Sequence, residues 1–195
     1  MRERKGIMEP EMIIAQSAHA AYYKAAEYFN IKLVTLKVDR NYQLPVKELK
    51  KRVGYNTILI VASAPGFPHG VIDPIEQISA VAQDNGVLRH VDCCLGGFFL
   101  PFAKEFKTEI PPFDFSVKGR VPPLTKCLSK WQGWPLGVTS ISIDTHKYGM
   151  AHKGTSVVLY RSPALRKYQY TAVTDWTGGM YISPGLLTVL FCDLC

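Results

Sequence analysis

The sequence has no long hydrophobic run, which excludes a membrane-spanning helix of the usual length. Its apolar stretch near the C-terminus, residues 185–192, is too short to cross a bilayer. The charged residues 2–5 are not followed by the apolar segment that a secretory signal peptide requires. We therefore expect no membrane anchor in this chain and a cytoplasmic location.

Long runs of like charge are also missing, although the chain carries a net charge of +7 at pH 7. The 23 lysines and arginines are scattered, apart from a cluster at residues 47–52 that also contains a glutamate. We interpret this cluster as the solvated face of a helix. The sequence therefore gives no indication of a nucleic-acid partner.

Cysteine spacings typical of a zinc site or a disulfide framework are absent as well. Of the five cysteines, Cys93 and Cys94 are adjacent, Cys127 is isolated, and Cys192 and Cys195 lie near the C-terminus. This usage is typical of a protein from a reducing compartment, and we expect no bound metal.

Six short segments have the composition of β-strands, and helical patterns separate most of them. The segments begin near Met12, Lys32, Thr57, Val87, Val138 and Thr155. Residues 57–62 are apolar without interruption, which is typical of a strand that is covered on both faces. We therefore predict an α/β fold, a mostly parallel sheet with helices on both faces, whose last strand is antiparallel or at an edge.

Helix start signals occur in three of the connections between these strands. Residues 17–29 have an amphipathic helical pattern, with Ser17 as the expected cap and with Tyr22 and Phe29 on the apolar face. Pro45 falls in the first turn of a second predicted helix. Asp73 is expected to cap a third, and Gly86 is expected to end it.

One stretch, residues 120–137, fits no element. It contains three prolines, two tryptophans and no usable periodicity, although it lies between regular segments. A structureless stretch of that length is uncommon inside a compact domain. We predict that it is an insert outside the sheet.

Lys147 lies in the segment VTSISIDTHKYG (residues 138–149), where a strand pattern breaks into polar residues and a glycine. Side chains at the carboxyl ends of strands line the ligand sites of open α/β sheets. An amine held there beside a histidine and an aspartate could form a Schiff base with an aldehyde cofactor, because lowering the pKa of a lysine makes it a nucleophile. For a single lysine, a solvated position in a loop would be the simpler interpretation.

His19 and Asp92 also lie at the carboxyl ends of predicted strands. Pyridoxal phosphate requires a lysine, an acid that keeps the pyridine nitrogen protonated, and a flat side chain against the ring. Taken separately, Asp92 could cap a turn, and His19 could satisfy backbone groups at the start of a helix. In one chain with Lys147, the two favour a pyridoxal-phosphate site.

Five motifs are more specific than this general pattern. They are SAHAA (residues 17–21), APGFPHGVIDPI (64–75), HVDCCLGGF (90–98), DTHKYG (144–149) and TDWTGGMY (174–181). These motifs resemble those of the sphingosine-1-phosphate lyases, and the similarity covers residues 9–184 apart from the insert.

The resemblance implies the large domain of a type I pyridoxal-phosphate enzyme, which cleaves a phosphorylated long-chain base to a fatty aldehyde and phosphoethanolamine. By the same resemblance, Lys147 is the Schiff-base lysine, Asp92 pairs with the pyridine nitrogen, and His19 stacks on the ring. His146 lies near the cofactor phosphate, and Lys153 assists catalysis or binds the substrate phosphate, unless it is only a turn lysine. For the intact family, the resemblance implies a homodimer at the endoplasmic reticulum membrane, facing the cytosol.

Four differences from the family pattern lead us to expect an incomplete enzyme. The Gly/Ser/Thr-rich segment that grips the cofactor phosphate in the family has no counterpart before Met12. Residues 120–137 interrupt a family segment, residues 185–195 diverge from it, and Cys93 stands where the family usually has alanine. We therefore expect an incomplete cofactor domain over residues 1–184, followed by a divergent tail, with little or no activity of the chain alone.

Two alternatives stay open at this point. The first is an amino-acid decarboxylase of the same fold, which would use the same ring and lysine but release carbon dioxide. The second is a non-catalytic fragment that at most pairs with a full-length partner.

Overall fold

The computed structural model describes residues 6–103, 105–117 and 137–183, which form parts of two units, Met1–Leu159 and Tyr160–Cys195. The predicted insert at residues 120–137 lies outside the described residues except for Gly137, as does the tail at residues 185–195. The first unit contains nearly all of the sheet and every candidate site residue.

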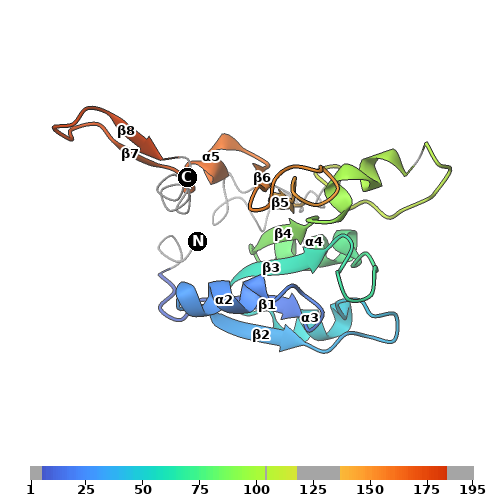
Figure 1. Ribbon diagram of the computed structural model, residues 1–195. Helices are drawn as coiled ribbons and strands as arrows, with labels where there is room; N and C mark the ends of the chain where they lie inside the picture. Colours follow the sequence, from blue (N-terminus) through green and yellow to red (C-terminus); the bar gives the residue numbers. More distant parts are fainter. Residues whose placement is uncertain (1–5, 104, 118–136, 184–195) are drawn as a thin grey trace. The chain divides into compact units, whose positions relative to one another are not determined.

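A six-stranded sheet organises the first unit (Figure 1). The strands are β1 (Glu11–Ala15), β2 (Lys32–Leu36), β3 (Thr57–Ser63), β4 (Leu88–Asp92), β5 (Ser140–Ile143) and β6 (Val157–Tyr160). Their spatial order is β2-β1-β3-β4-β5-β6, and the pairs β1–β2, β1–β3, β3–β4 and β4–β5 are parallel. The predicted fold class is confirmed, and β6 lies at an edge of the sheet as expected.

Helices cover both faces because neighbouring side chains of a strand point in opposite directions. In β1, Ile13 belongs to a core cluster with residues of α3 (Val46–Arg52) and α4 (Ile75–Asp84). The next residue, Ile14, belongs to a separate cluster with Ala26 of α2 (Ala21–Tyr28). Uninterrupted apolar residues in β1 and β3 therefore supply two cores at once.

The strand order also shows where the direction of the chain reverses. From β1 the chain passes through α2 to β2, and it then returns through α3 to β3 on the other side of β1. Right-handed crossovers in opposite directions place their helices on opposite faces of the sheet. The reversal lies between β1 and β3, and ligands of such sheets bind near this point, at the carboxyl ends of the strands.

The first helix is shorter than predicted. It begins after Ala20, which makes no side-chain capping bond, so Ser17 is not its cap. Phe29 is more than half exposed and does not belong to the apolar face. Instead, Nδ1 of His19 accepts a hydrogen bond from the N–H of Ala21, 3.1 Å away, and this bond satisfies one of the free amides at the helix start.

Two other helix boundaries lie close to the predicted positions. Pro45 is the N-cap of α3 rather than a residue of its first turn. Gly86 follows α4 with a φ of 60°, a left-handed conformation that costs glycine little.

Asp73 does not cap α4, contrary to the sequence prediction, since α4 begins after Pro74 without a side-chain cap. The buried carboxylate instead accepts the N–H of Leu44 at 2.7 Å with Oδ1 and the N–H of Ser63 at 2.8 Å with Oδ2. Burial raises the pKa of Asp73, and the two backbone hydrogen bonds oppose that rise. Asp73 thereby joins the segment before α3 to the end of β3.

Cys93 occupies a tight contact between the loops that follow β3 and β4. Its buried thiol donates to the carbonyl oxygen of Ala64 at 3.1 Å. Burial, followed by the charge of Asp92, raises the pKa of Cys93 to about 12, so the sulfur stays a thiol. A Cβ at Gly96 would lie 2.2 Å from the same carbonyl oxygen, which requires glycine there. Cys93, which stands where the family usually has alanine, thus fits between these loops as a neutral thiol.

The second unit contributes the short helix α5 (Pro163–Arg166) and an antiparallel pair, β7 (Thr171–Val173) and β8 (Tyr181–Ser183). The TDWTGGMY motif forms the connection between β7 and β8 and ends on the first residue of β8. In the part of the chain that the structure describes, no helix is both long enough and apolar enough to span a bilayer.

We predict that Asp73→Ala lowers the free energy of unfolding by about 2 to 5 kcal/mol, because two buried N–H groups lose their acceptor. Asp73→Asn should cost less, since its carbonyl oxygen still accepts one bond. Urea denaturation measures both effects. The matched control is Asp39→Ala: the Asp39 carboxylate also accepts two backbone N–H groups, from Asn41 and Gln43, but it is exposed. Equal losses at the two positions would show that burial is not the cause.

Candidate functional site

A cavity of about 480 Å³ lies at the carboxyl ends of the strands, on the α2 side of the sheet. Its lining consists of His19, Ala21, Tyr22, Ala25, His90, Asp92, Cys94, Ser142, Asp144, His146, Lys147 and Val158. Four of the five side chains that the sequence singled out, His19, Asp92, His146 and Lys147, thus meet at one place. Lys153 does not line the cavity and is exposed in the turn that follows His152.

Asp92 is the last residue of β4, and its carboxylate is buried. Its Oδ1 accepts the N–H of Cys94 at 3.1 Å and the hydroxyl of Ser142 at 3.2 Å. The bond from Cys94 is the turn-capping contact that the simpler interpretation expected. The same bonds also stabilise a negative charge at the wall of the cavity.

His90 lies two residues before Asp92 and therefore on the same face of β4. Its Nδ1 is 2.8 Å from Oγ of Ser140, and its Nε2 is 3.1 Å from Oγ of Ser142. Burial lowers the pKa of His90 to about 4, although the charge of Asp92 partly opposes the shift. The imidazole is therefore neutral at physiological pH.

Tyr22 of α2 faces the same carboxylate from the helix side. Its ring centre lies 6.2 Å from that of His90. Burial first, and then the charge of Asp92, raises the pKa of Tyr22 well above its usual value. The tyrosine is thus a neutral hydroxyl that shares hydrogen bonds with Asp92 and Ser142.

Lys147 follows β5 and pairs with Asp144, whose Oδ2 lies 2.8 Å from Nζ. Burial alone would lower the pKa of Lys147, but the hydrogen bonds to Asp144 and Cys94 and the charge of Asp144 outweigh it, so the pKa is raised. The amine is therefore protonated in the free chain. This differs from the lowered pKa that a nucleophilic lysine needs, and the cause is the adjacent carboxylate.

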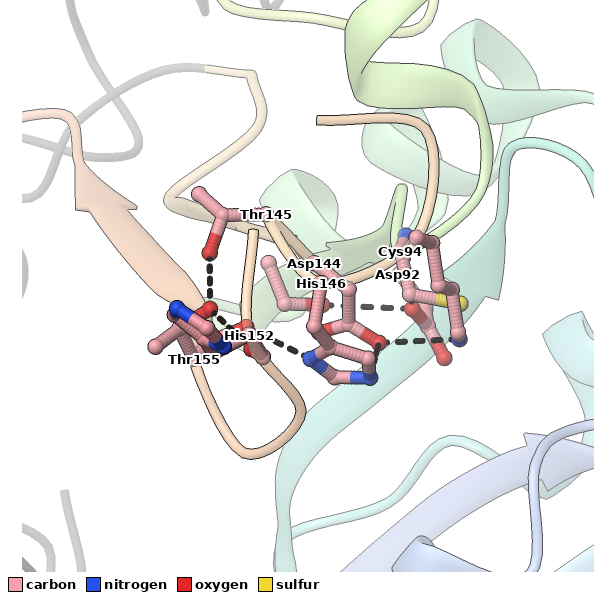
Figure 2. A network of polar contacts seen from close by, with 9 residues as sticks. Asp92, Cys94, Asp144, Thr145, His146, His152 and Thr155 are labelled. Atoms are coloured by element: carbon pink, nitrogen blue, oxygen red, sulfur yellow. Dashed lines mark hydrogen bonds and ion pairs between the residues drawn. The ribbon is translucent and has the colours of Figure 1, made fainter. Parts of the chain in front are cut away.

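Hydrogen bonds shape the turn around Lys147 (Figure 2). Nδ1 of His146 donates to the carbonyl oxygen of Thr155 at 2.6 Å, and its Nε2 lies 3.7 Å from Oδ2 of Asp144. The hydroxyl of Thr145 donates to that of Thr155 at 2.7 Å, which in turn donates to the carbonyl oxygen of His152 at 2.8 Å. The segment carrying Lys147 is thus fixed to the strand that follows it.

His19 reaches the cavity from the segment between β1 and α2. Because Nδ1 accepts the N–H of Ala21, the ring proton is on Nε2. The contact with the helix start is the simpler role that the sequence suggested. It also fixes the imidazole at the rim of the cavity.

Sequence reasoning missed Tyr22, His90 and Ser142 as site residues. The alternation of side chains along β4 would have placed His90 beside Asp92. No local pattern could have found Ser142, because it pairs with Asp92 only through the register of β4 and β5. Tyr22 was assigned to the apolar face of its helix, and its hydroxyl contacts depend on the packing of α2 against the sheet.

The chemistry of this lining fits pyridoxal phosphate. One amine, Lys147, is available for the aldehyde, and one buried carboxylate, Asp92, is available for the pyridine nitrogen. His19 supplies a flat ring at the same cavity. Within residues 6–103, 105–117 and 137–183, no group of three or more histidine, cysteine or acidic side chains is placed to hold a metal ion.

Comparison with known proteins gives consistent similarities. Residues 8–96 match the family "Aminotransferase class-V". The chain is 53% identical over 184 residues to the sphingosine-1-phosphate lyase of Arabidopsis thaliana, covering 94% of this chain and 30% of that protein. A solved sphingosine-1-phosphate lyase from Burkholderia pseudomallei K96243 is 41% identical with a TM-score of 0.80, covering 95% of this chain and 38% of that one.

A glutamate decarboxylase from Lactobacillus brevis CGMCC 1306 shares the fold, with a TM-score of 0.71 at 22% identity, covering 95% of this chain and 40% of that one. The chain spans about 30% of the length of the sphingosine-1-phosphate lyases that it matches by sequence. Over more than nine-tenths of its residues, therefore, this chain is similar in sequence to sphingosine-1-phosphate lyases and similar in fold to part of a solved one.

Proposed function

We propose that the chain is part of a pyridoxal-phosphate-dependent lyase that cleaves phosphorylated sphingoid bases to a fatty aldehyde and phosphoethanolamine. The observation that carries the proposal is the meeting of Lys147, Asp92 and His19 at one cavity, in a chain homologous to lyases of this kind. In the overall reaction, the bond between the amine-bearing and hydroxyl-bearing carbons breaks. The hydroxyl loses its proton and becomes the aldehyde, and the amine-bearing carbon gains a proton.

Four side chains would hold the cofactor. Lys147 would bind its aldehyde, Asp92 its pyridine nitrogen, His19 the face of its ring, and His146 would lie near its phosphate. When bound, pyridoxal phosphate supplies an electron-withdrawing ring that accepts the electron pair of the broken bond. The proposal for Asp92 is supported by its burial and by two donors on Oδ1, which favour a fixed negative charge.

Asp144 controls the proton of Lys147 in this proposal. The ammonium must lose a proton before Nζ can act as a nucleophile. Oδ2 of Asp144, 2.8 Å from Nζ, can hold that proton nearby, and it stabilises the charged amine until a ligand arrives. The pair therefore keeps a reactive lysine in a resting, protonated state.

Lys153 has a separate proposed role. It is exposed in the turn held by the hydroxyl of Thr155 and the carbonyl oxygen of His152. We propose that it binds the substrate phosphate or assists catalysis. A turn lysine without function remains the alternative, and an unchanged affinity of Lys153→Ala for a phosphorylated sphingoid base would favour it.

The surroundings of the intact protein are proposed on the family resemblance alone. The substrate partner is a phosphorylated long-chain base. The intact enzyme would be a homodimer and would work on the cytosolic side of the endoplasmic reticulum membrane. Since the chain spans about 30% of the length of its relatives, we propose that these 195 residues alone have little or no activity.

We predict that Lys147 is the lysine that reacts preferentially with pyridoxal phosphate. Incubation with the cofactor, borohydride reduction and peptide mapping should place most of the label on Lys147, because it faces the cavity. Lys153, which is exposed outside the cavity, serves as an internal control. Label spread evenly over surface lysines, or unchanged total labelling in Lys147→Ala, would contradict the prediction.

We predict that Asp144→Asn speeds the labelling of Lys147 at neutral pH by about 1.4- to fivefold. Removing the carboxylate lowers the pKa of the amine, so a larger fraction is unprotonated, and a partly exposed ion pair contributes about 0.2 to 1 kcal/mol. In the native chain, the labelling rate should rise with pH as long as Lys147 is mainly protonated. Asp84→Asn, which removes an exposed charge on α4, is the control and should leave the rate unchanged. A slower reaction in Asp144→Asn would mean that Asp144 acts mainly by positioning the amine or accepting its proton rather than by stabilising the ammonium form.

We predict that the isolated chain releases fatty aldehyde from a phosphorylated sphingoid base at least about a hundredfold more slowly than an intact lyase. Misplacement of a catalytic group by about 1 Å can cost that much, and these 195 residues span only about 30% of the length of the relatives. The assay follows aldehyde and carbon dioxide together, with Lys147→Ala as the control. Lysine-dependent turnover near that of an intact lyase would show that the chain suffices, and carbon dioxide release from an amino acid would favour the decarboxylase alternative.

A further inference from the structure

A row of polar side chains runs along one face of β4 and β5 and ends at Asp92. The parallel register pairs His90 with Ser140 and Asp92 with Ser142. These four side chains lie on one face, since each strand contributes two residues that are two positions apart. The distances are 2.8 Å from Ser140 Oγ to His90 Nδ1, 3.1 Å from His90 Nε2 to Ser142 Oγ, and 3.2 Å from Ser142 Oγ to Asp92 Oδ1.

The carboxylate of Asp92, at the end of the row, determines which group donates in each of these hydrogen bonds. A carboxylate only accepts, so the single hydroxyl proton of Ser142 is donated to Asp92. Oγ of Ser142 must then accept from His90, which places the ring proton on Nε2. Nδ1 of the neutral ring is left as an acceptor for the hydroxyl of Ser140.

We propose that His90 is a positioning residue: by donating from Nε2, it fixes the Ser142 hydroxyl as a donor to Asp92 and so holds the carboxylate that faces the cofactor. The inference rests on the proposed function for the role of Asp92. The direction of the hydrogen bonds is independent of that function. His90 acts through Ser142 and does not itself need to touch a ligand.

The surroundings of the row support this assignment. The lowered pKa of His90, about 4, keeps the ring neutral, so that only one of its nitrogens donates. From α2, Tyr22 faces Asp92 and Ser142 as a neutral hydroxyl. It therefore adds no charge that could change the direction of the hydrogen bonds in the row. The lysine among the cavity residues, Lys147, is paired with Asp144. Asp92 is therefore held by oriented neutral donors.

Nitrogen NMR of the ligand-free chain with labelled histidine tests the direction directly. We expect His90 to be neutral with its proton on Nε2, and to remain so from neutral pH to about pH 5. In Ser142→Ala the tautomer should become mixed, because both the acceptor of Nε2–H and the connection to Asp92 are lost. Ser140→Ala, which makes the same change two residues away on β5, should retain the Nε2 proton. A proton on Nδ1, or a cationic ring at neutral pH, would overturn the proposal.

Two amide substitutions test positioning against simple packing. The nitrogen of His90→Gln can reach the place of Nε2 and still donate to Ser142, whereas that of His90→Asn reaches only the place of Nδ1. We expect His90→Asn to weaken the affinity for pyridoxal phosphate by about three- to tenfold, as the loss of one neutral hydrogen bond implies, and His90→Gln to change it less than about threefold. Equal losses in the two variants would point to packing and overturn the proposal.

The two experiments separate this inference from the proposed function. If the native chain binds no pyridoxal phosphate, the proposed function fails, and the tautomer of His90 in the ligand-free chain still decides the direction of the row. If the cofactor binds but His90 carries its proton on Nδ1, the proposed function stands and the positioning role is wrong. Should either His90 variant fail to fold, the comparison of Ser142→Ala with Ser140→Ala decides.

Discussion

The parallel alignment of β1, β3, β4 and β5 is the constraint on which the site depends. Parallel strands end at the same edge of the sheet, so residues that follow three different strands reach one cavity. His19, Asp92 and Lys147 are far apart in the sequence, and no local interaction could bring them together. The reversal of chain direction between β1 and β3 places α2 on the cavity side and leaves α3 and α4 to cover the other face.

The same parallel alignment brings the charged groups Lys147, Asp144 and Asp92 to one cavity, where each charge is compensated by a neighbouring group. Asp144 neutralises Lys147, while Asp92 is held by a backbone N–H and a serine hydroxyl rather than by a cation. This division matters for the proposed chemistry, since a permanent cation beside Asp92 would compete with a protonated pyridine nitrogen. The ion pair with Asp144 raises the pKa of Lys147. Burial keeps His90, which lies next to Asp92 on β4, neutral.

Polar contacts behind the site hold its loops in place. The buried carboxylate of Asp73 joins the segment before α3 to the end of β3, and the thiol of Cys93 and the bare backbone of Gly96 allow the following loop to approach Ala64. Each contact is buried, so each is expected to contribute more than a similar contact on the surface. The site is thus supported by the packing of the loops at the strand ends as well as by its own side chains.

The sequence by itself determined the six strands and the positions of Lys147, Asp92 and His19 after three of them, because uninterrupted apolar runs and the breaks that follow them are local signals. It also carried the motifs that link the chain to the lyases. The local sequence predicted helix caps at Ser17 and Asp73, and both predictions are wrong. A side-chain acceptor can bind backbone amides of a distant segment instead of those of the helix that follows it, as Asp73 does with Leu44.

Only the tertiary structure decided which side chains control the site. The row from Ser140 through His90 to Asp92 depends on a register between strands about fifty residues apart, and sequence spacing contains no information on that register. The protonation of Lys147 depends on a 2.8 Å contact with Asp144 and on partial burial. Both quantities are set by distance and solvent exclusion, which arise only when the sheet, α2 and the turn after β5 have packed together.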